Sequence, residues 1–344
     1  MQEIIRRALS EELFERIGPT MEALPERYFT VHSETQIADH ASAIDTLTPE
    51  YPVRVVSRDA RHGRHSFTIC TWDAPGLFSY ISGILGARGF NIQEGEVFTG
   101  SNGLVVDSFT GIMPADTDFP RWNDALEREL ATLFASLQES PPDIDAVRVT
   151  VMERVAKRYT TLSQGHHRSD DPEPLLPIRI HIDDDGTLTR VAVTSQDTPF
   201  FLYSLANALA LQDMSIRQVA IETRNTEVQD TFWVEHARGG AVTGESDRRR
   251  LQLSILVTKQ FSHALDQAAD PRGAFIRFEE LVRKVAGDGS SRRIQDLLAD
   301  PAAQRELARL LGASDFLWED FIRLQYESLL PLLQQSHARR PLST

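Results

Sequence analysis

The chain has 344 residues, 41% of them hydrophobic, which is enough for two or three domains that each bury a core. Its formal net charge of −14 argues against a nucleic-acid partner, because phosphate binding needs clustered Lys and Arg side chains. The single cysteine, Cys70, excludes an intramolecular disulfide and a cysteine-rich metal site. It lies in an apolar, β-branched run, and we interpret it as a small strand residue.

The first 48 residues are expected to form a helical and extended lead-in. They begin MQEIIRRALSEELFERI, in which charged and apolar residues recur at helical spacing, unlike a signal peptide. No apolar run in the chain approaches the roughly 18 residues that cross a membrane. We therefore expect a cytoplasmic protein without a membrane or nucleic-acid partner.

An internal repeat organises the middle of the chain. The segment that starts at Pro52 recurs at Pro177. Three of its positions recur at an offset of 124 residues, and these are Asp73 with Asp197, Pro75 with Pro199, and Asn91 with Ser215. Further on, VVDSF matches VQDTF, which aligns Asp107 with Asp230. Both aspartates alternate with apolar residues, and we expect them to face solvent or to pair across the sheet.

Each repeat unit predicts two strands, a helix, two more strands and a second helix. The strands are rich in β-branched and aromatic residues, and the helices carry apolar residues at helical spacing. In the first unit the elements are expected at 52–57, 65–72, 76–88, 91–98, 104–113 and 120–137. In the second they are expected at 177–182, 187–196, 200–212, 215–223, 228–236 and 247–268, after a linker helix at 144–159. Two helices on one face of a four-stranded antiparallel sheet make an α+β, ferredoxin-like sandwich.

The turn before the first helix of each unit is suited to an amino-acid ligand. A helix N-terminus offers unpaired N–H groups and partial positive charge, which suit a carboxylate. Gly76 would let a ligand approach the backbone, and we expect valine there to abolish a ligand response with a modest loss of stability. Asp73 could accept from an ammonium group, and Asn91 offers donors and an acceptor. Plain helix capping explains Asp73 and Asp197 equally well.

The residues Asp73-Ala74-Pro75-Gly76-Leu77-Phe78, with Gly89-Phe90-Asn91-Ile92 a helix later, resemble an ACT domain. The pair of units, each with its extra leading strand, is similar to the C-terminal ACT pair of PII uridylyltransferases. The segment Leu24 to Ala41 resembles the stretch near that family's phosphohydrolase domain. The tail from Leu297 to Leu330 instead looks like the helical repeat of glutamine synthetase adenylyltransferases.

The resemblance implies two tandem ferredoxin-like ACT domains, of βαββα topology plus an extra strand, and a C-terminal helical segment. The expected division is a lead-in at 1–48, the first ACT domain and linker helix at 49–165, the second ACT domain at 166–269 and the helices at 270–344. It also implies allosteric binding of an amino acid, glutamine first among the candidates. The chain would then control a nucleotidyltransferase that modifies glutamine synthetase or PII.

The sequence gives no sign of the chemistry of those enzymes. A nucleotidyltransferase needs Gly-Ser followed by Asp-x-Asp, and the run Asp183-Asp184-Asp185 lacks the Gly-Ser. The histidines lack the His-Asp pair of a phosphohydrolase. We therefore expect no catalytic residue, no cofactor and no metal, and the chain is interpreted as a regulatory subunit or as part of a larger enzyme. Two alternatives are a ligand-free interaction or oligomerisation module built from ACT folds, and an enzyme with an unrecognised site.

The candidate ligand-binding residues come from both turns. They are Asp73, Ala74, Pro75, Gly76, Leu77, Phe78 and Asn91 in the first unit, and Asp197, Pro199, Phe200 and Ser215 in the second. Phe200 stands where the first unit has Gly76, so its side chain could instead fill the second pocket. The sheets of the two units are expected to pair within the chain or in a homodimer. The C-terminal helices are expected to dock on a catalytic domain or a partner protein.

Overall fold

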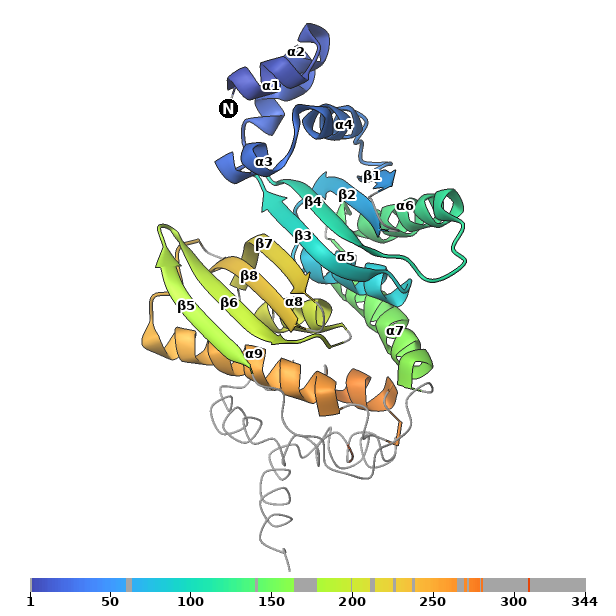
Figure 1. The fold of residues 1–344 in the computed structure, drawn as a ribbon, viewed down its shortest axis with the longest axis vertical. Coiled ribbons are helices and arrows are strands. Elements are labelled where there is room, and N and C mark those ends of the chain that lie inside the picture. The colour runs from blue at the N-terminus through green and yellow to red at the C-terminus, as the bar shows by residue number, and fades with distance from the viewer. Residues whose placement is uncertain are drawn as a thin grey trace, which may run out of the picture.

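One antiparallel sheet of eight strands runs through the described part of the chain, in the order β1-β2-β4-β3-β7-β8-β6-β5 (Figure 1). The computed structural model describes residues 2–59, 64–139, 142–163, 178–198, 200–210, 214–224, 227–236, 239–264, 269–270, 272–278, 280 and 309. The strands are β1 (Val53–Asp59), β2 (Arg64–Trp72), β3 (Asn91–Thr99), β4 (Leu104–Ile112), β5 (Arg179–Asp185), β6 (Leu188–Gln196), β7 (Met214–Arg224) and β8 (Glu227–His236).

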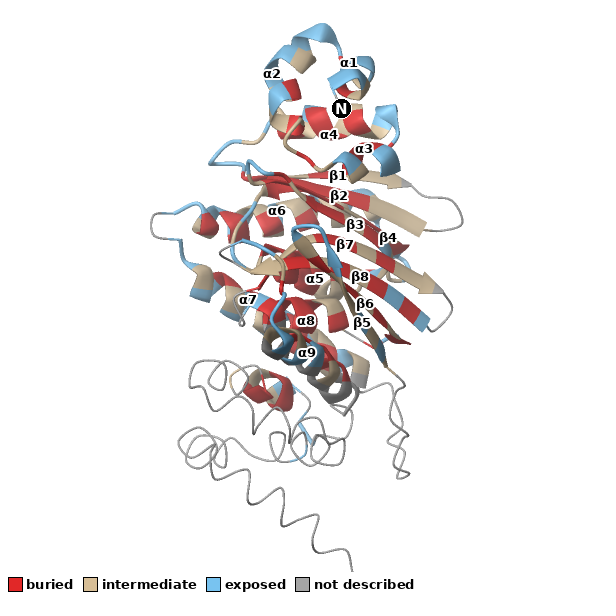
Figure 2. Cartoon of the chain, turned by 90° about the vertical axis from the view of Figure 1, so that its left-hand side faces the viewer, coloured by how far each residue is buried: buried red, intermediate tan, exposed pale blue. Residues whose placement is uncertain are grey.

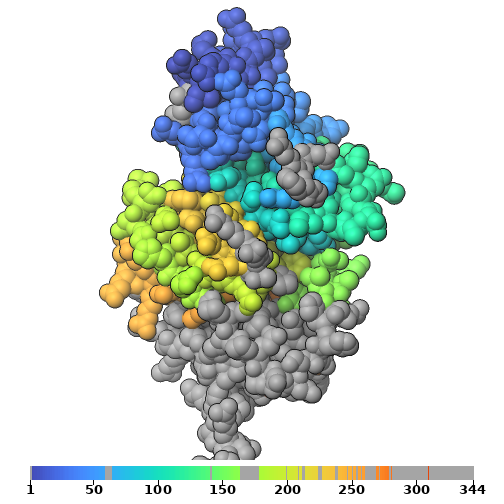
Figure 3. Space-filling view, in the orientation of Figure 1, coloured from blue at the N-terminus to red at the C-terminus, as the bar shows by residue number. Residues whose placement is uncertain are grey.

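Helices cover both faces of the first half of this sheet. Among the described residues they are α1 (Gln2–Ala8), α2 (Glu11–Met21), α3 (Glu26–Val31), α4 (Glu34–Ile44), α5 (Leu77–Ala87), α6 (Phe119–Leu137), α7 (Ile144–Ser163), α8 (Phe201–Ala210) and α9 (Glu245–Ala264). Helices α5 to α9 lie on one side of the sheet (Figure 1). Helices α1 to α4 pack against the other face of the first half, and their residues form the blue end of the molecule in Figure 3. The order of elements is the same in both halves, as the repeat predicts.

The alternation of side chains along the strands explains the two layers of core (Figure 2). In β2 and β4, Ile69 and Val105 face α5 and α6, whereas Cys70 and Val106 face the N-terminal helices. Cys70 is fully buried in that second cluster, as expected for a small strand residue, and burial raises the pKa of its thiol. The expected α+β class is therefore confirmed, with a second apolar cluster that holds the lead-in helices.

The two halves join through β3 and β7, which pair antiparallel from Glu94 with Glu222 to Phe98 with Gln218. Helices α5 and α8 meet beneath this junction. A Cβ on Gly83 of α5 would lie 2.7 Å from the ring of Tyr203 and 2.7 Å from the side chain of Val151, so only glycine allows this approach. Of the two expected modes of pairing, the structure has the one within the chain.

One expectation about the strands is wrong. Asp107 and Asp230 do not face solvent, because their side chains are 1% and 2% exposed. In β8, Val228, Asp230, Phe232 and Val234 share the buried face. The alternation of the strand thus places a carboxylate in the core of each half.

The C-terminal helices are only partly described. Residues 272–278 are helical, and the ring of Phe275 lies against Tyr159 and Tyr203, with centroids 6.3 and 6.0 Å apart. The adenylyltransferase-like tail, Leu297 to Leu330, lies almost wholly outside the described residues. Within the described residues, no helix has the length and apolar character needed to cross a membrane.

Candidate functional site

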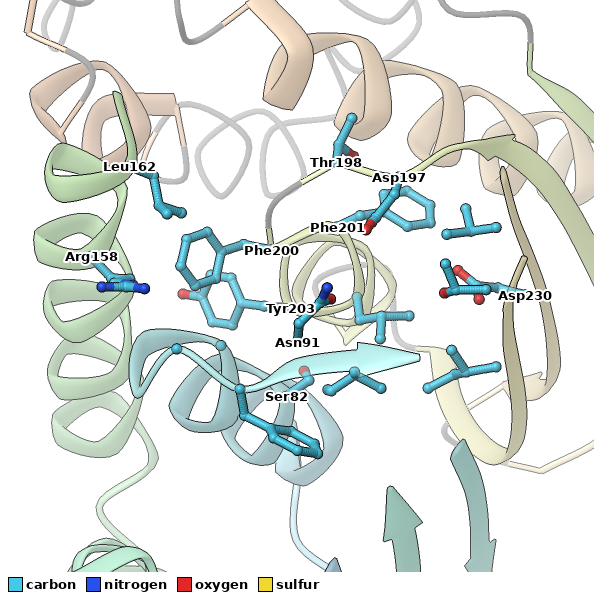
Figure 4. A pocket seen from close by; sticks show the side chains of 18 residues that line it. Ser82, Asn91, Arg158, Leu162, Asp197, Thr198, Phe200, Phe201, Tyr203 and Asp230 are labelled. Atoms are coloured by element: carbon cyan, nitrogen blue, oxygen red, sulfur yellow. The ribbon is translucent and has the colours of Figure 1, made fainter. Parts of the chain in front are cut away.

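A cavity of about 350 Å³ lies between the two halves, where the C-terminal end of α5 faces the N-terminal end of α8 (Figure 4). The first half contributes Ser82, Gly86 and Asn91 to its wall, and α7 contributes Arg158 and Leu162. The second half contributes residues of the α8 turn and of the sheet beneath, which include Asp197, Thr198, Phe200, Phe201, Tyr203 and Asp230. Its volume falls in the range of small-molecule sites.

The α8 turn supplies the first polar wall. The chain leaves β6 at Gln196, passes through Asp197 and Thr198, and enters α8 at Phe201. The amide of Phe201 donates to the carbonyl of Thr198 at 3.3 Å, which closes the first turn. A helix start of this kind carries partial positive charge, while the adjacent carboxylate of Asp197 is negative. Opposite charges therefore lie side by side at the cavity.

Asn91 reaches the same cavity from the other half. It begins β3, and a β-bulge between Ile92 and Glu94 follows it at once. Its carbonyl oxygen lies only 2.0 Å from the place that a Cβ on Gly111 would take, so glycine at 111 is required for this backbone path. Figure 4 shows Asn91 between the α8 turn and α5, where its amide can donate and accept.

A cation and a second carboxylate complete the polar groups. Arg158 of α7 lies beside the α5 end of the cavity, where a Cβ on Gly89 would approach its guanidinium to 3.1 Å. Asp230 lies at the floor with its Oδ1 atom buried and without a hydrogen-bond partner. Arg158, Tyr203 and Asp230 line the cavity although the sequence did not indicate them as site residues. The alternation along β8 could have indicated Asp230, because it places Asp230 on the same face of the strand as the buried Val228 and Phe232.

Lys259 of α9 stands behind Asp230 in the core of the second half. Its side chain is fully buried, and its ammonium lies 3.9 Å above the ring of Phe201. Burial raises the pKa of Asp230 and lowers the pKa of Lys259, and the attraction between their charges opposes both shifts. The charges of Asp230 and Lys259 at the floor of the cavity therefore depend on each other.

Phe200 has the backbone conformation of the glycine that it replaces. Its φ is 58°, in the left-handed region, and φ of Gly76 in the first half is 80°. A bulky residue in this region is strained by roughly 1–2 kcal/mol. The ring of Phe200 lies against Gly86 of α5, where a Cβ would come within 2.9 Å of it. Both turns thus have a left-handed residue at this position, and in the second turn the side chain of that residue is part of the cavity wall.

The expected site residues fall into two groups. Asn91, Asp197 and Phe200 line the cavity, and Pro199 lies outside the described residues. The other group lies at the opposite end of α5 and comprises Asp73, Ala74, Pro75, Gly76, Leu77 and Phe78, of which Leu77 and Phe78 are buried in the core. Because α5 has 11 residues and is roughly 16 Å long, Asp73 and Asn91 lie at opposite ends of this helix and cannot contact the same small ligand. Ser215 lies at the start of β7 and is not part of the cavity wall.

Asp73 forms an ion pair with an arginine of the other half, Arg217. Its Oδ2 atom lies 3.2 Å from a guanidinium nitrogen of Arg217, and Arg217 also forms an ion pair with Glu235. Burial raises the pKa of Asp73, and the charge of Arg217 opposes that shift. The helix cap itself is Gly76, whose backbone makes the turn without a side-chain hydrogen bond. The simple capping role considered for Asp73 is therefore not the arrangement observed.

Alanine at Gly76 is expected to lower the free energy of unfolding by about 2 kcal/mol. The residue has a positive φ, and a Cβ would lie 2.9 Å from the hydroxyl of buried Tyr80. Valine at Gly76 would thus damage the fold and cannot serve as a clean test of ligand binding, contrary to the expectation from sequence. Gly186→Ala is the matched control, because Gly186 has φ of 65° and nothing near its Cβ position. Urea unfolding should show a loss of about 1 kcal/mol there, and an equal loss at both positions would contradict the argument from Tyr80.

The chain is similar in sequence to bifunctional uridylyltransferase/uridylyl-removing enzymes. A bifunctional uridylyltransferase/uridylyl-removing enzyme of Bordetella pertussis is 27% identical over 246 residues, which are 70% of this chain and 26% of the relative. The enzyme of the same description from Erythrobacter litoralis is 26% identical over 280 residues, 79% of this chain and 27% of the relative. That from Azospirillum brasilense is 28% identical over 228 residues, 65% of this chain and 22% of the relative. No family model matches the chain.

The similarity to uridylyltransferases expected from the sequence is therefore confirmed. The chain spans about a quarter of the length of these relatives. The match to only part of a bifunctional enzyme is consistent with the expected non-catalytic regulatory region. The expected likeness of the tail to adenylyltransferases stays a prediction.

Proposed function

We propose that the chain is a non-catalytic, amino-acid-sensing module of nitrogen metabolism built from two ACT-type domains. Each half has the order of elements that the ACT resemblance implies, with one extra strand in front. The relatives are named as uridylyltransferases and uridylyl-removing enzymes, which supports a role in controlling a nucleotidyltransferase that modifies glutamine synthetase or PII. Glutamine is the first candidate for the ligand.

The cavity between the halves carries this proposal. The start of α8 and Arg158 can receive a carboxylate, whereas Asp197 and Asp230 can receive an ammonium group. The side chain of Asn91 can pair with a ligand amide through one donor and one acceptor. A zwitterion with a polar side chain would use all of these groups at once.

A ligand at this place would act by population shift. It contacts both halves and α7, so it favours the arrangement in which these three parts close on it. Tyr203 of the cavity wall also touches Phe275, which connects the site to the helical residues 272–278. We propose that these helices report the bound state to a catalytic domain or a partner protein.

Thermal unfolding with single amino acids and 2-oxoglutarate at millimolar concentration tests the proposal. Glutamine at about 100 times its dissociation constant should stabilise the native state by roughly 2.7 kcal/mol. Asp197→Asn removes the charge that faces the ligand ammonium and should abolish the shift in melting temperature. Asp124→Asn, on an exposed position of α6, is the matched control and should keep the full shift.

The alternative is a ligand-free interaction module. The ring of Phe200 in the cavity wall, at the position of Gly76, favours this alternative, because it takes up space near the helix start. The same experiment separates the two functions. A protein that responds to no amino acid would support the interaction module, and a selective response that Asp197→Asn removes would support the sensor.

A further inference from the structure

A lysine occupies a core position of α9, the last helix of the second half. Residues four apart lie on one face of a helix, and α9 has the same spacing of buried residues as its counterpart α6. The residues are Leu251, Ile255 and Lys259 in α9, and Leu126, Leu130 and Phe134 in α6. A lysine is almost never fully buried unless its charge is compensated. The core of the second half must therefore supply a partner for the charge of Lys259.

The ammonium of Lys259 lies behind the wall of the cavity. It is 3.9 Å from the centroid of the Phe201 ring, and Phe201 is part of that wall. A cation above an aromatic ring is stabilised most when it is removed from water. Two further wall residues, Asp197 and Asp230, attract the same ammonium. It has no hydrogen-bond partner among the described residues, so its charge is compensated by these two carboxylates and the ring.

The first half offers the comparison without a lysine. Asp107 is the counterpart of Asp230, and both side chains are buried. Among the described residues, the charged group that acts on Asp107 is another carboxylate, Asp73, and burial raises the pKa of Asp107 well above its usual value. At Asp230 the charge of Lys259 opposes the rise in pKa that burial causes. Burial thus favours an uncharged Asp107, whereas Lys259 favours the carboxylate form of Asp230.

The charge of Asp230 determines what the cavity floor can bind. A carboxylate attracts an ammonium group and accepts its hydrogen bonds, whereas a protonated carboxyl group is uncharged and donates a hydrogen bond of its own. The Oδ1 atom of Asp230 has no hydrogen-bond partner among the described residues, so its capacity as an acceptor is unused. The wall thus contains an acceptor whose charge depends on a residue outside it.

We propose that Lys259 is a positioning residue that keeps Asp230 in its carboxylate form and thereby makes the cavity floor a site for a ligand ammonium group. This inference rests on the proposed function of the cavity. Lys259 is fully buried and is not part of the cavity wall, so it acts through Asp230 and not by touching the ligand. Asp197 and Asp230 would then face two ammonium groups, one from Lys259 and one from the ligand. The charges at the floor balance, while Arg158 remains for the ligand carboxylate.

Isothermal titration of the full chain with L-glutamine at pH 7.5 tests this inference. Lys259→Met keeps most of the side-chain volume without the charge, and it should bind about ten-fold or more weakly, because the pKa of Asp230 rises by at least one unit. Adding Asp230→Asn should then change the affinity by less than about two-fold, since an amide and a protonated carboxyl group are both uncharged. Lys157→Met, at an exposed position of α7, is the matched control and should keep the wild-type affinity.

The pH dependence separates this role from a purely structural one. Between pH 7 and pH 9 the affinity of Lys259→Met should recover relative to that of the double variant, because Asp230 can ionise and asparagine cannot. Asp197 and Arg158, the other charged residues of the described wall, are present in both chains. Their titration and that of glutamine therefore cancel in the ratio. Lys259→Gln, which keeps a donor without the charge, should weaken binding as Lys259→Met does and provides the test from a second side chain.

The outcomes separate this inference from the function on which it rests. Wild-type affinity in Lys259→Met, or a further ten-fold loss when Asp230→Asn is added at pH 7.5, would overturn the role of Lys259 while the sensor stands. A ratio of the two affinities that is the same at every pH would also overturn it. No binding to the wild-type chain, by glutamine or by any other amino acid, would instead overturn the proposed function itself.

Discussion

Replacement of Gly111 by alanine is expected to destabilise the protein by about 3 kcal/mol or more. The new Cβ would lie 2.0 Å from the carbonyl oxygen of Asn91 and 2.9 Å from both the Asn91 carbonyl carbon and the ring of Phe90. A backbone oxygen cannot rotate away as a side chain can, so the start of β3 would have to move away from β4. Urea unfolding should show a lower midpoint with a similar dependence on denaturant.

Gly103→Ala is the control for this substitution. Gly103 lies in the turn that joins β3 to β4, with φ of 84° and nothing within 4 Å of its Cβ position. Its replacement should cost only the strain of the left-handed backbone, about 1 kcal/mol. A larger loss at Gly103 than at Gly111 would show that turn strain, and not the contact with Asn91, limits the stability of this strand pair. Because Asn91 also lines the cavity, Gly111→Ala should weaken any ligand response as well.

The topology was predictable because local patterns and the repeat agree. Alternation marked the strands and helical spacing marked the helices, and the two units supported each other's boundaries. The strands expected at 91–98 and 215–223, for example, are Asn91–Thr99 and Met214–Arg224. The order of the strands within the joined sheet, and the use of β3 and β7 as the junction, depends on tertiary contacts that no local pattern records.

The site was only half predictable for the same reason. The turn before the helix indicated Asp197, and the start of the next strand indicated Asn91, but Asn91 was expected to serve the turn of its own unit. Pairing of β3 with β7 instead brings it to the turn of the other unit, and α7 adds Arg158 from outside both repeats. Asp107 and Asp230 were expected at the surface or in cross-strand pairs because their side chains are charged. Their positions in the alternation of the strands, on the same face as valine and phenylalanine, instead indicated burial.

Acidification from pH 7 to pH 5 is expected to remove about 2 kcal/mol of stability through His40 alone. His40 of α4 is 1% exposed and lies between the lead-in helices and the sheet. Burial lowers its pKa to about 3, and the nearby His32 and Arg58 act in the same direction. Below pH 6.5 the unfolded chain takes up a proton that the folded chain refuses, so stability falls as pH falls toward 3. Urea unfolding at several pH values measures the effect as the difference between wild type and His40→Gln.

The comparison with His40→Gln is needed because other buried groups titrate in the opposite direction. Burial raises the pKa values of Asp107 and Asp230, so these carboxyls favour the folded state as pH falls. His32 adds to the effect of His40, since burial lowers its pKa as well.

Tyr28→Phe is the control for the hydrogen bond. The hydroxyl of Tyr28 lies 2.9 Å from Nδ1 of His40, and its loss should lower stability by a similar amount at each pH. The glutamine variant should instead approach wild-type stability on acidification, with the gap narrowing by about 2 kcal/mol between pH 7 and pH 5. A gap that stays constant would mean that His40 is not the group that couples the lead-in helices to pH. If the difference in stability between wild type and Tyr28→Phe narrows by the same amount, the pH dependence comes from the hydrogen bond and not from the charge of His40.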